Sequence, residues 1–190
     1  MNHDNEIRVL AIPGSLRDRS LNRMLLDAAI ELAPEGVEID VADIGELPHY
    51  DQDLDDSVVA SFRDQVEAAD ALLFVSPEFN WSIPGVLKNA IDWVSRPAGR
   101  SALAGKPAAI MGVSAGPAGT GRMQMHLRDV LLSTRTHVLM NSLQVPHGAE
   151  KFDASGQLVD ADVREGARSL LHQLAVSVGS HERHRRAVAA

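Results

Sequence analysis

The stretch ALLFVSPEFNWSIPGVLKNAIDWVSRP, residues 71–97, decides the fold because it joins a strand, a polar turn and a helix in one run. Its first five residues are all apolar, which is typical of a parallel strand buried on both faces. Pro84 and Gly85 then open a helix in which apolar residues recur at helical spacing, namely Leu87, Ala90, Ile91 and Val94. The turn at 76–83 therefore follows the carboxyl end of a strand, where open α/β sheets bind small molecules.

Strands and helices alternate through the rest of the chain. The patterns predict strands over 7–12, 37–41, 71–75, 107–113 and 136–139. They predict helices over 21–32, 57–69, 84–95, 121–133 and 159 to about 178, with Ser57 as the cap of the second. Alternation of this kind implies right-handed crossovers and helices on both faces of a parallel sheet. We therefore predict an α/β fold, a flavodoxin-like three-layer sandwich whose five-stranded parallel sheet has the order 2-1-3-4-5.

Length and composition favour one compact domain. The 190 residues are 45% hydrophobic, which suits a single domain, 1–190, with a sizeable core. Residues 181–186 form the one basic cluster, and Glu182 lies among its charges. We expect 181–190 to be a flexible, solvated tail.

Composition also excludes several classes of function. The chain has no Cys, so disulfides, thiolate nucleophiles and Cys-ligated metals are excluded. A formal net charge of -8 disfavours nonspecific binding to nucleic acid. No stretch approaches the roughly 20 apolar residues that span a bilayer, and the start lacks the pattern of an export signal. We therefore expect a cytoplasmic protein with no nucleic-acid or membrane partner.

The loop after the first strand has the composition of an anion site. It reads PGSLRDRSLNR, residues 13–23, and leads directly into a helix, whose N-terminal N–H groups favour a phosphate. Ser15, Ser20 and the fork of Arg17 would add donors, although a capped helix start with surface arginines explains the loop equally well. Neither a Walker loop nor GxGxxG is present, so the loop suits the terminal phosphate of a mononucleotide.

The loop after the fourth strand, GVSAGPAGTG at 112–121, is rich in small residues that let backbone approach a flat ligand. It also spells GxSxG around Ser114, with Asp153 or Asp160 and then His172 in the chain order of a serine hydrolase. A flexible segment follows Ser114 where a helix should begin, and no HGGG-type segment precedes it, so a hydrolase remains a remote alternative.

No metal site is assigned. The acidic segment 42–56 lacks the glycine and the terminal glutamate of an EF-hand loop, and a solvated surface loop explains it. The eight histidines are scattered and none is paired at a metal-binding spacing on a helix.

Three segments together resemble the NADPH-dependent FMN reductase family, which includes chromate and quinone reductases and related azoreductases. They are GSLRDRSLN at 14–22, PEFNWSIPGVLKNAIDWVSRP at 77–97, and the glycine-rich segment that begins at Gly105. The resemblance covers about 7–145. It implies an enzyme that passes hydride from NADPH or NADH through bound FMN to a small acceptor such as a quinone, an azo compound, chromate or free flavin.

The resemblance also implies which residues hold FMN, with no catalytic side chain required because the cofactor carries the chemistry. The phosphate would meet the first loop, the isoalloxazine edge would follow the second, and the third would close the other side. The residues implied are Ser15, Arg17, Ser20, Leu21, Asn22, Pro77, Glu78, Phe79, Asn80, Ser114 and Gly116.

Two departures from the family pattern stand in the second loop. Phe79 replaces a common Tyr, which keeps the aromatic surface and removes a hydroxyl. Trp81 is bulky for its place, and it would narrow the substrate opening, pack on a partner subunit or simply cover its own loop.

The resemblance and an apolar surface favour a homodimer or homotetramer. The helix from Pro84 has a second apolar edge, which with the helix after it fits a twofold interface; the residues are Ile83, Val86, Ala90, Trp93, Met123, Met125 and Leu127. The main alternative function is a flavodoxin-type electron carrier without NAD(P)H activity, and a scaffold domain that has lost the cofactor is a third.

Overall fold

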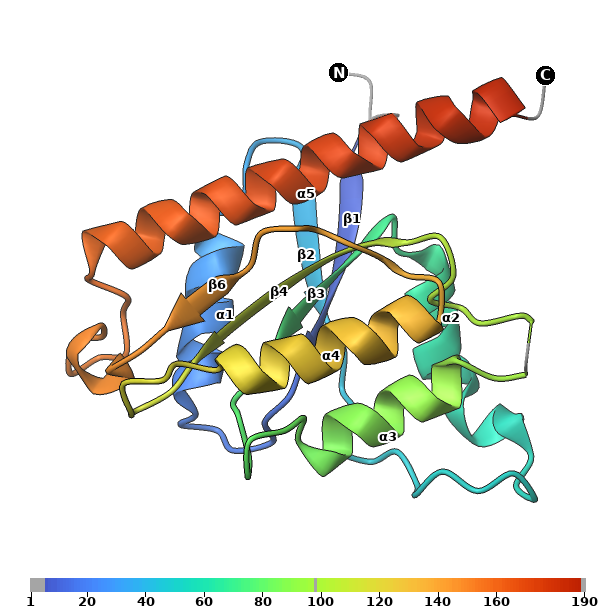
Figure 1. The fold of residues 1–190 in the computed structure, drawn as a ribbon, viewed down its shortest axis with the longest axis horizontal. Coiled ribbons are helices and arrows are strands. Elements are labelled where there is room, and N and C mark those ends of the chain that lie inside the picture. Colours follow the sequence, from blue (N-terminus) through green and yellow to red (C-terminus); the bar gives the residue numbers. More distant parts are fainter. Residues whose placement is uncertain (1–5, 98, 189–190) are drawn as a thin grey trace.

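The structure is a computed structural model that describes residues 6–97 and 99–188, with side chains as far as Ser180. Strands and helices alternate along the chain, as Figure 1 shows. The elements are β1 (Ile7–Pro13), α1 (Leu21–Glu31), β2 (Val37–Val41), α2 (Ala60–Ala68), β3 (Ala71–Val75), α3 (Gly85–Val94), β4 (Pro107–Val113), α4 (Gly121–Ser133), β5 (His137–Val138), β6 (Leu143–Val145) and α5 (Ala161–Val188).

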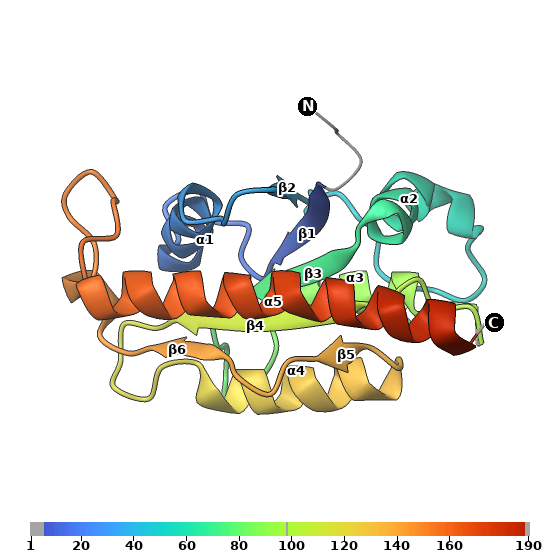
Figure 2. The same ribbon diagram turned by 90° about the horizontal axis from the view of Figure 1, so that it is seen from above.

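The strands form one parallel sheet in the order β2-β1-β3-β4-β5, which confirms the predicted fold class and strand order. The order can be followed from β2 to β5 in Figure 2. The fifth strand position differs from the prediction, because two short strands share it: β5 pairs with the start of β4, and β6 pairs with its end. Between them, the guanidinium of Arg128 binds the carbonyl oxygens of Leu139 and Met140. The three residues of β6 were missed because so short a segment shows no periodicity.

Two apolar layers hold the helices against the sheet. Side chains at alternate positions of a strand point to opposite faces. Val9 and Ala11 of β1 accordingly pack with α1 and α5, whereas Leu10 and Ile12 pack with α2, α3 and α4. Because β3 and β4 are buried at every position, the middle of the sheet is covered on both faces.

Two predicted helix boundaries are wrong. The helix expected from residue 57 begins as a short turn of 3-10 helix, Asp56–Val59, which is capped by Asp55 rather than Ser57: the Asp55 carboxylate accepts from the Ser57 N–H at 2.8 Å. The last helix continues past 178 to Val188, so most of the segment expected as a tail is helical, and residues 189–190 lie outside the described residues. Within the described part of the chain, every helix is too short or too polar to cross a membrane.

Candidate functional site

A pocket of about 300 Å³ lies at the carboxyl ends of β1, β3 and β4, where their three loops meet. Its lining contains every residue predicted for the cofactor site except Asn80 and Gly116. The lining residues are Ser15, Arg17, Ser20, Leu21, Asn22, Pro77, Glu78, Phe79, Val113, Ser114 and Ala115. Larger hollows of about 480 and 730 Å³ lie beside β2 and over the loop at 48–54, away from these strand ends.

The loop after β1 presents hydrogen-bond donors to this pocket. Ser20 caps α1 by accepting from the Asn22 N–H at 3.2 Å. Among the described residues, the N–H groups of Ser15, Leu16 and Leu21 have no hydrogen-bond acceptor. Arg17 is exposed, and among the described residues its guanidinium donates one long hydrogen bond, 3.4 Å, to the Arg19 carbonyl in the same loop. Free N–H groups at a helix N-terminus beside a guanidinium fit a phosphate.

Asn22 lines the pocket, and its side chain also binds a neighbouring strand. Its side-chain amide is buried, and it binds the backbone of Val113 twice: Nδ2 donates to the carbonyl oxygen at 2.9 Å, and Oδ1 accepts from the N–H at 2.9 Å. The amide thereby ties the start of α1 to the end of β4. The side chain of Asn22 therefore fixes the position of the phosphate loop relative to β4.

Close backbone contacts allow the loops to converge. A Cβ at Gly14 would lie 2.1 Å from the hydroxyl oxygen of Ser76, and one at Gly112 would lie 2.3 Å from the Ser76 carbonyl oxygen. Gly148, in the segment after β6, packs in the same way against Val113 and Leu21. Only glycine fits these positions without displacement of the loops that line the pocket.

The loop after β3 is a tight two-residue turn. Phe79 and Ser82 exchange backbone hydrogen bonds of 3.1 and 2.9 Å, and Asn80 and Trp81 between them have φ angles of 49° and 66°. Positive φ angles at both central residues are the mark of a type I′ turn. The turn leaves Phe79 half exposed at the pocket and Trp81 66% exposed beside it.

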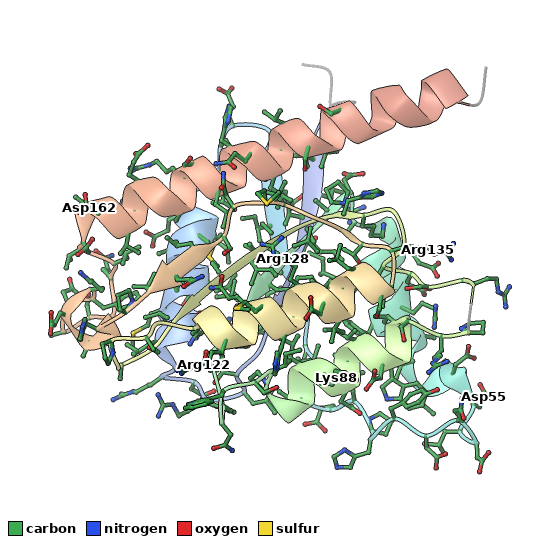
Figure 3. The ribbon with its side chains drawn as sticks, viewed as in Figure 1. Asp55, Lys88, Arg122, Arg128, Arg135 and Asp162 are labelled. Carbon is green, nitrogen blue, oxygen red and sulfur yellow. The ribbon has the colours of Figure 1, made fainter. Side chains whose placement is uncertain are left out.

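Glu78 lines the pocket but turns its carboxylate to the N-terminus of α4. One of its oxygens accepts from the N–H groups of Arg122 and Met123, each at 3.0 Å. The other oxygen lies 3.7 Å from the guanidinium of Arg122. Figure 3 shows Arg122 at the start of α4. Glu78 therefore caps α4 with its carboxylate, although the residue lines the pocket.

The loop after β4 is fastened to the segment after β6. The Ser114 N–H donates to the Val145 carbonyl at 3.0 Å, and the N–H groups of His147 and Gly148 donate to the carbonyls of Gly116 and Ser114. The Ser114 hydroxyl itself donates to the Gly116 carbonyl at 3.1 Å. This side of the pocket is thus held by backbone bonds.

The residues suggested for a hydrolase do not form a triad. His172 is exposed on α5, and it has no hydrogen bond to Ser114 among the described residues. Asp160 is bound to Lys151 at 2.7 Å, a hydrogen bond that lowers the pKa of the Asp160 carboxyl. Asp153 is used by the turn that follows it, where it accepts from Ser155 and Gln157.

The apolar edge expected for an interface is mostly core of the single chain. Ala90, Trp93, Met123 and Leu127 are buried, and Ile83 and Val86 pack against the same core. Of the expected residues only Met125 is exposed, at 69%.

Sequence reasoning missed Val113, Ala115 and Arg122 at the site. Val113 was counted as the end of a strand, and Ala115 carries no functional group. Arg122 lies in a predicted helix, 44 residues from Glu78, so nothing local marks their contact.

Comparisons with known proteins agree with this geometry. The family model for NADPH-dependent FMN reductases matches residues 7–150. An NAD(P)H-dependent FMN reductase of Pseudomonas aeruginosa is 46% identical over 90% of this chain and 94% of its own length. A 2-hydroxy-1,4-benzoquinone reductase of Burkholderia is 42% identical over 90% of this chain and 96% of its own.

Solved structures agree as well. The flavoenzyme NAD(P)H:(acceptor) oxidoreductase FerB of Paracoccus denitrificans superimposes with a TM-score of 0.84 at 34% identity, over 92% of this chain and 98% of its own. The family match over 7–150 covers the strands and all three loops of the pocket, and the resemblance predicted from the sequence is confirmed. The chain belongs to the NADPH-dependent FMN reductase family.

Proposed function

We propose that this chain holds FMN in the pocket at the ends of β1, β3 and β4 and uses it to reduce quinones with NAD(P)H. FMN is the cofactor of the family, and NAD(P)H is its co-substrate. The observation that carries the proposal is that one pocket brings together Arg17, an aromatic side chain and N–H groups that have no acceptor among the described residues. Two of the relatives are named for NAD(P)H and for a quinone, which supports the choice of substrates.

The two ends of the pocket have different tasks. Ser15, Arg17 and the N-terminal N–H groups of α1 bind the phosphate of FMN, and the Ser20 cap keeps that helix start in place. The turn at 77–79 offers backbone groups and the ring of Phe79 to the flavin. Bound FMN would supply two-electron chemistry, by which NAD(P)H, a proton and a quinone are converted to NAD(P)⁺ and the hydroquinone.

The protein contributes position and electrostatics rather than a side-chain acid or base. Backbone N–H groups in rigid loops stabilise negative charge without reorganising when it develops. Three sets of hydrogen bonds make the loops rigid. Asn22 joins the first loop to β4, and Glu78 joins the second loop to α4. Ser114 forms a hydrogen bond within the third loop.

We further propose that the chain acts in the cytoplasm as a homo-oligomer. Three exposed apolar side chains lie around Arg128, namely Met125, Leu132 and Met140. Such a patch suits a second copy of the chain better than water. Replacing Met125 and Met140 by Glu together should reduce the mass in light scattering to that of a monomer.

The first test is a visible spectrum of the purified, FMN-loaded and desalted protein, followed by anaerobic addition of NADPH or NADH. Flavin absorption that is retained and then bleached, and that returns when a quinone is added, is the expected result. Flavin that stays oxidised would indicate the electron-carrier alternative, and protein that retains no flavin would contradict the proposal.

A further inference from the structure

The ring of Trp81 is held out from the protein in a conformation that costs free energy. Its φ angle of 66° lies in the left-handed region, which bulky residues rarely occupy. The side chain is 66% exposed, so burial does not compensate for the strain. Strained residues cluster at sites where a ligand is held. The chain thus retains a tryptophan at a position where Asn or Gly would be more stable.

One face of the Trp81 ring is covered by the guanidinium of Arg122. The Arg122 Cζ lies 4.0 Å from the ring centroid, a close cation–π contact. In the described part of the chain, this guanidinium donates no hydrogen bond, and the nearest carboxylate, that of Glu78, lies at 3.7 Å. Arg122 is thus paired with Glu78 through one nitrogen at 3.7 Å, and its half-exposed guanidinium has further donors that can meet an anion.

This pair lies at the rim of the flavin pocket. Phe79, which lines the pocket, is two residues from Trp81 in the same turn. Glu78, which also lines it, contacts Arg122. The turn is fixed to α4 at a second point, because the Ser82 hydroxyl lies 3.1 Å from Nδ1 of His126. A molecule approaching the flavin from this side meets the ring and the cation together.

We propose that Trp81 and Arg122 form a recognition site for planar aromatic acceptors that carry an anionic group, such as quinones with a sulfonate or an ionised hydroxyl. This inference rests on the proposed function and names the substrate class of that site. The free face of Trp81 stacks on the acceptor ring, while Arg122 meets its anionic group. Glu78 and the Ser82–His126 contact hold the turn so that both groups face the same ligand.

Steady-state kinetics of the FMN-loaded enzyme with matched acceptors tests the inference. A naphthoquinone sulfonate is compared with the parent naphthoquinone, and each variant is compared with wild type on the same acceptor. Arg122→Gln should lower kcat/KM for the sulfonate about tenfold more than for the parent, since one charge-assisted contact is lost. Arg168→Gln, which removes an equal charge from the exposed face of α5, should leave the ratio unchanged.

A second variant separates recognition from folding. Trp81→Asn should relieve the strain, because Asn tolerates positive φ, and it should also remove the stacking surface. We expect its resistance to urea to rise while KM rises for both acceptors. A variant that is more stable yet binds acceptors less well cannot owe its defect to misfolding.

Fluorescence gives a readout independent of turnover. Trp81 is the exposed tryptophan, whereas Trp93 is 2% exposed and binds the Pro48 carbonyl. In the FMN-loaded protein without NAD(P)H, nitrobenzenesulfonate should therefore quench tryptophan fluorescence saturably. The quenching should be lost in Arg122→Gln and weaker with neutral nitrobenzene.

The outcomes distinguish this inference from the proposed function. Failure of wild type to reduce the parent naphthoquinone would overturn the proposed function itself. Normal reduction, with equal effects of Arg122→Gln on both acceptors, would overturn only the recognition site. If Arg122→Gln affects both acceptors equally and also changes the mass of the protein in light scattering, Trp81 and Arg122 belong to a subunit interface instead.

Discussion

The side-chain amide of Asn22 grips the backbone of Val113 with two hydrogen bonds of 2.9 Å, across 91 residues of sequence. Asn22→Ala would leave the buried N–H and carbonyl of Val113 without partners. We expect a loss of about 2–3 kcal/mol in the free energy of unfolding. Urea unfolding of the flavin-free protein measures it, and Asn141→Ala, at an exposed amide, is the control. If the free energy of unfolding of Asn22→Ala equals that of wild type, the hydrogen bonds of Asn22 do not stabilise the fold.

Arg17 should contribute to the binding of FMN but not of riboflavin, because only FMN carries the phosphate. Arg17→Gln should weaken FMN binding about tenfold or more, in line with the loss of a charge-assisted contact. Riboflavin, titrated by quenching of its fluorescence, should bind both proteins alike. A similar loss for both flavins would place Arg17 elsewhere than at the phosphate.

Glu78 should stabilise α4 through its N-terminus. Glu78→Ala removes the acceptor of two N–H groups, for a loss of about 1–2 kcal/mol in the free energy of unfolding. Glu78→Gln keeps an acceptor and should lose less, about 0.5–1 kcal/mol. Glu165→Ala, on the exposed surface of α5, provides the control in the same urea series. An equal loss for Ala and Gln would mean that the charge alone matters.

The contact between Gly14 and Ser76 allows a rescue experiment. Gly14→Ala should cost about 1–3 kcal/mol, because its Cβ would overlap the Ser76 side chain. Ser76→Gly in the same chain should recover part of that loss.

Gly112→Ala is the matched comparison. Its Cβ would meet the Ser76 carbonyl oxygen at 2.3 Å, and that backbone atom remains in Ser76→Gly. Thermal unfolding of the three single variants and the two double variants measures both cases. Rescue of Gly112→Ala by Ser76→Gly would contradict the assigned contacts.

Asp160 should make the free energy of unfolding depend on pH in the acid range. The hydrogen bond from Lys151 lowers the pKa of Asp160 below its ordinary value of 3.8, so the folded state holds its proton less tightly than the unfolded state. The contribution is present above pH 3.8 and disappears as the pH falls through the lowered pKa. The stability difference between wild type and Asp160→Asn should therefore shrink in acid. Lys151→Met should show a weaker dependence, and a difference that is constant with pH would refute the assignment.

Much of the fold was predictable from local patterns. β2, β3, β4 and α4 lie at the predicted bounds, because each has an apolar run or a clear helical period between turn residues. The errors lie where patterns are weak or misleading: β6 is three residues long, and α5 continues through Gly179, which directly follows its expected end.

Oligomerisation was harder to predict from periodicity. A helix that is apolar around most of its surface fits either a deep core or an interface. The structure places Trp93 and Met123 in the core, and it leaves Leu132 and Met140 exposed. Which apolar face is covered depends on the neighbouring elements, so the period of one helix cannot decide it.

The sequence by itself determined the order of strands and helices, the family and the loops that make the pocket. It could do so because apolar periodicity is local, and because the carboxyl ends of adjacent parallel strands must meet at one edge. Only the tertiary structure decided which polar side chains at the pocket are engaged by other parts of the protein. Asn22 and Glu78 form hydrogen bonds to backbone 91 and 44 residues away, whereas Arg122 lies against the ring of Trp81 and 3.7 Å from Glu78. Contacts between residues so far apart depend on how the elements pack, which a pattern along the chain does not contain.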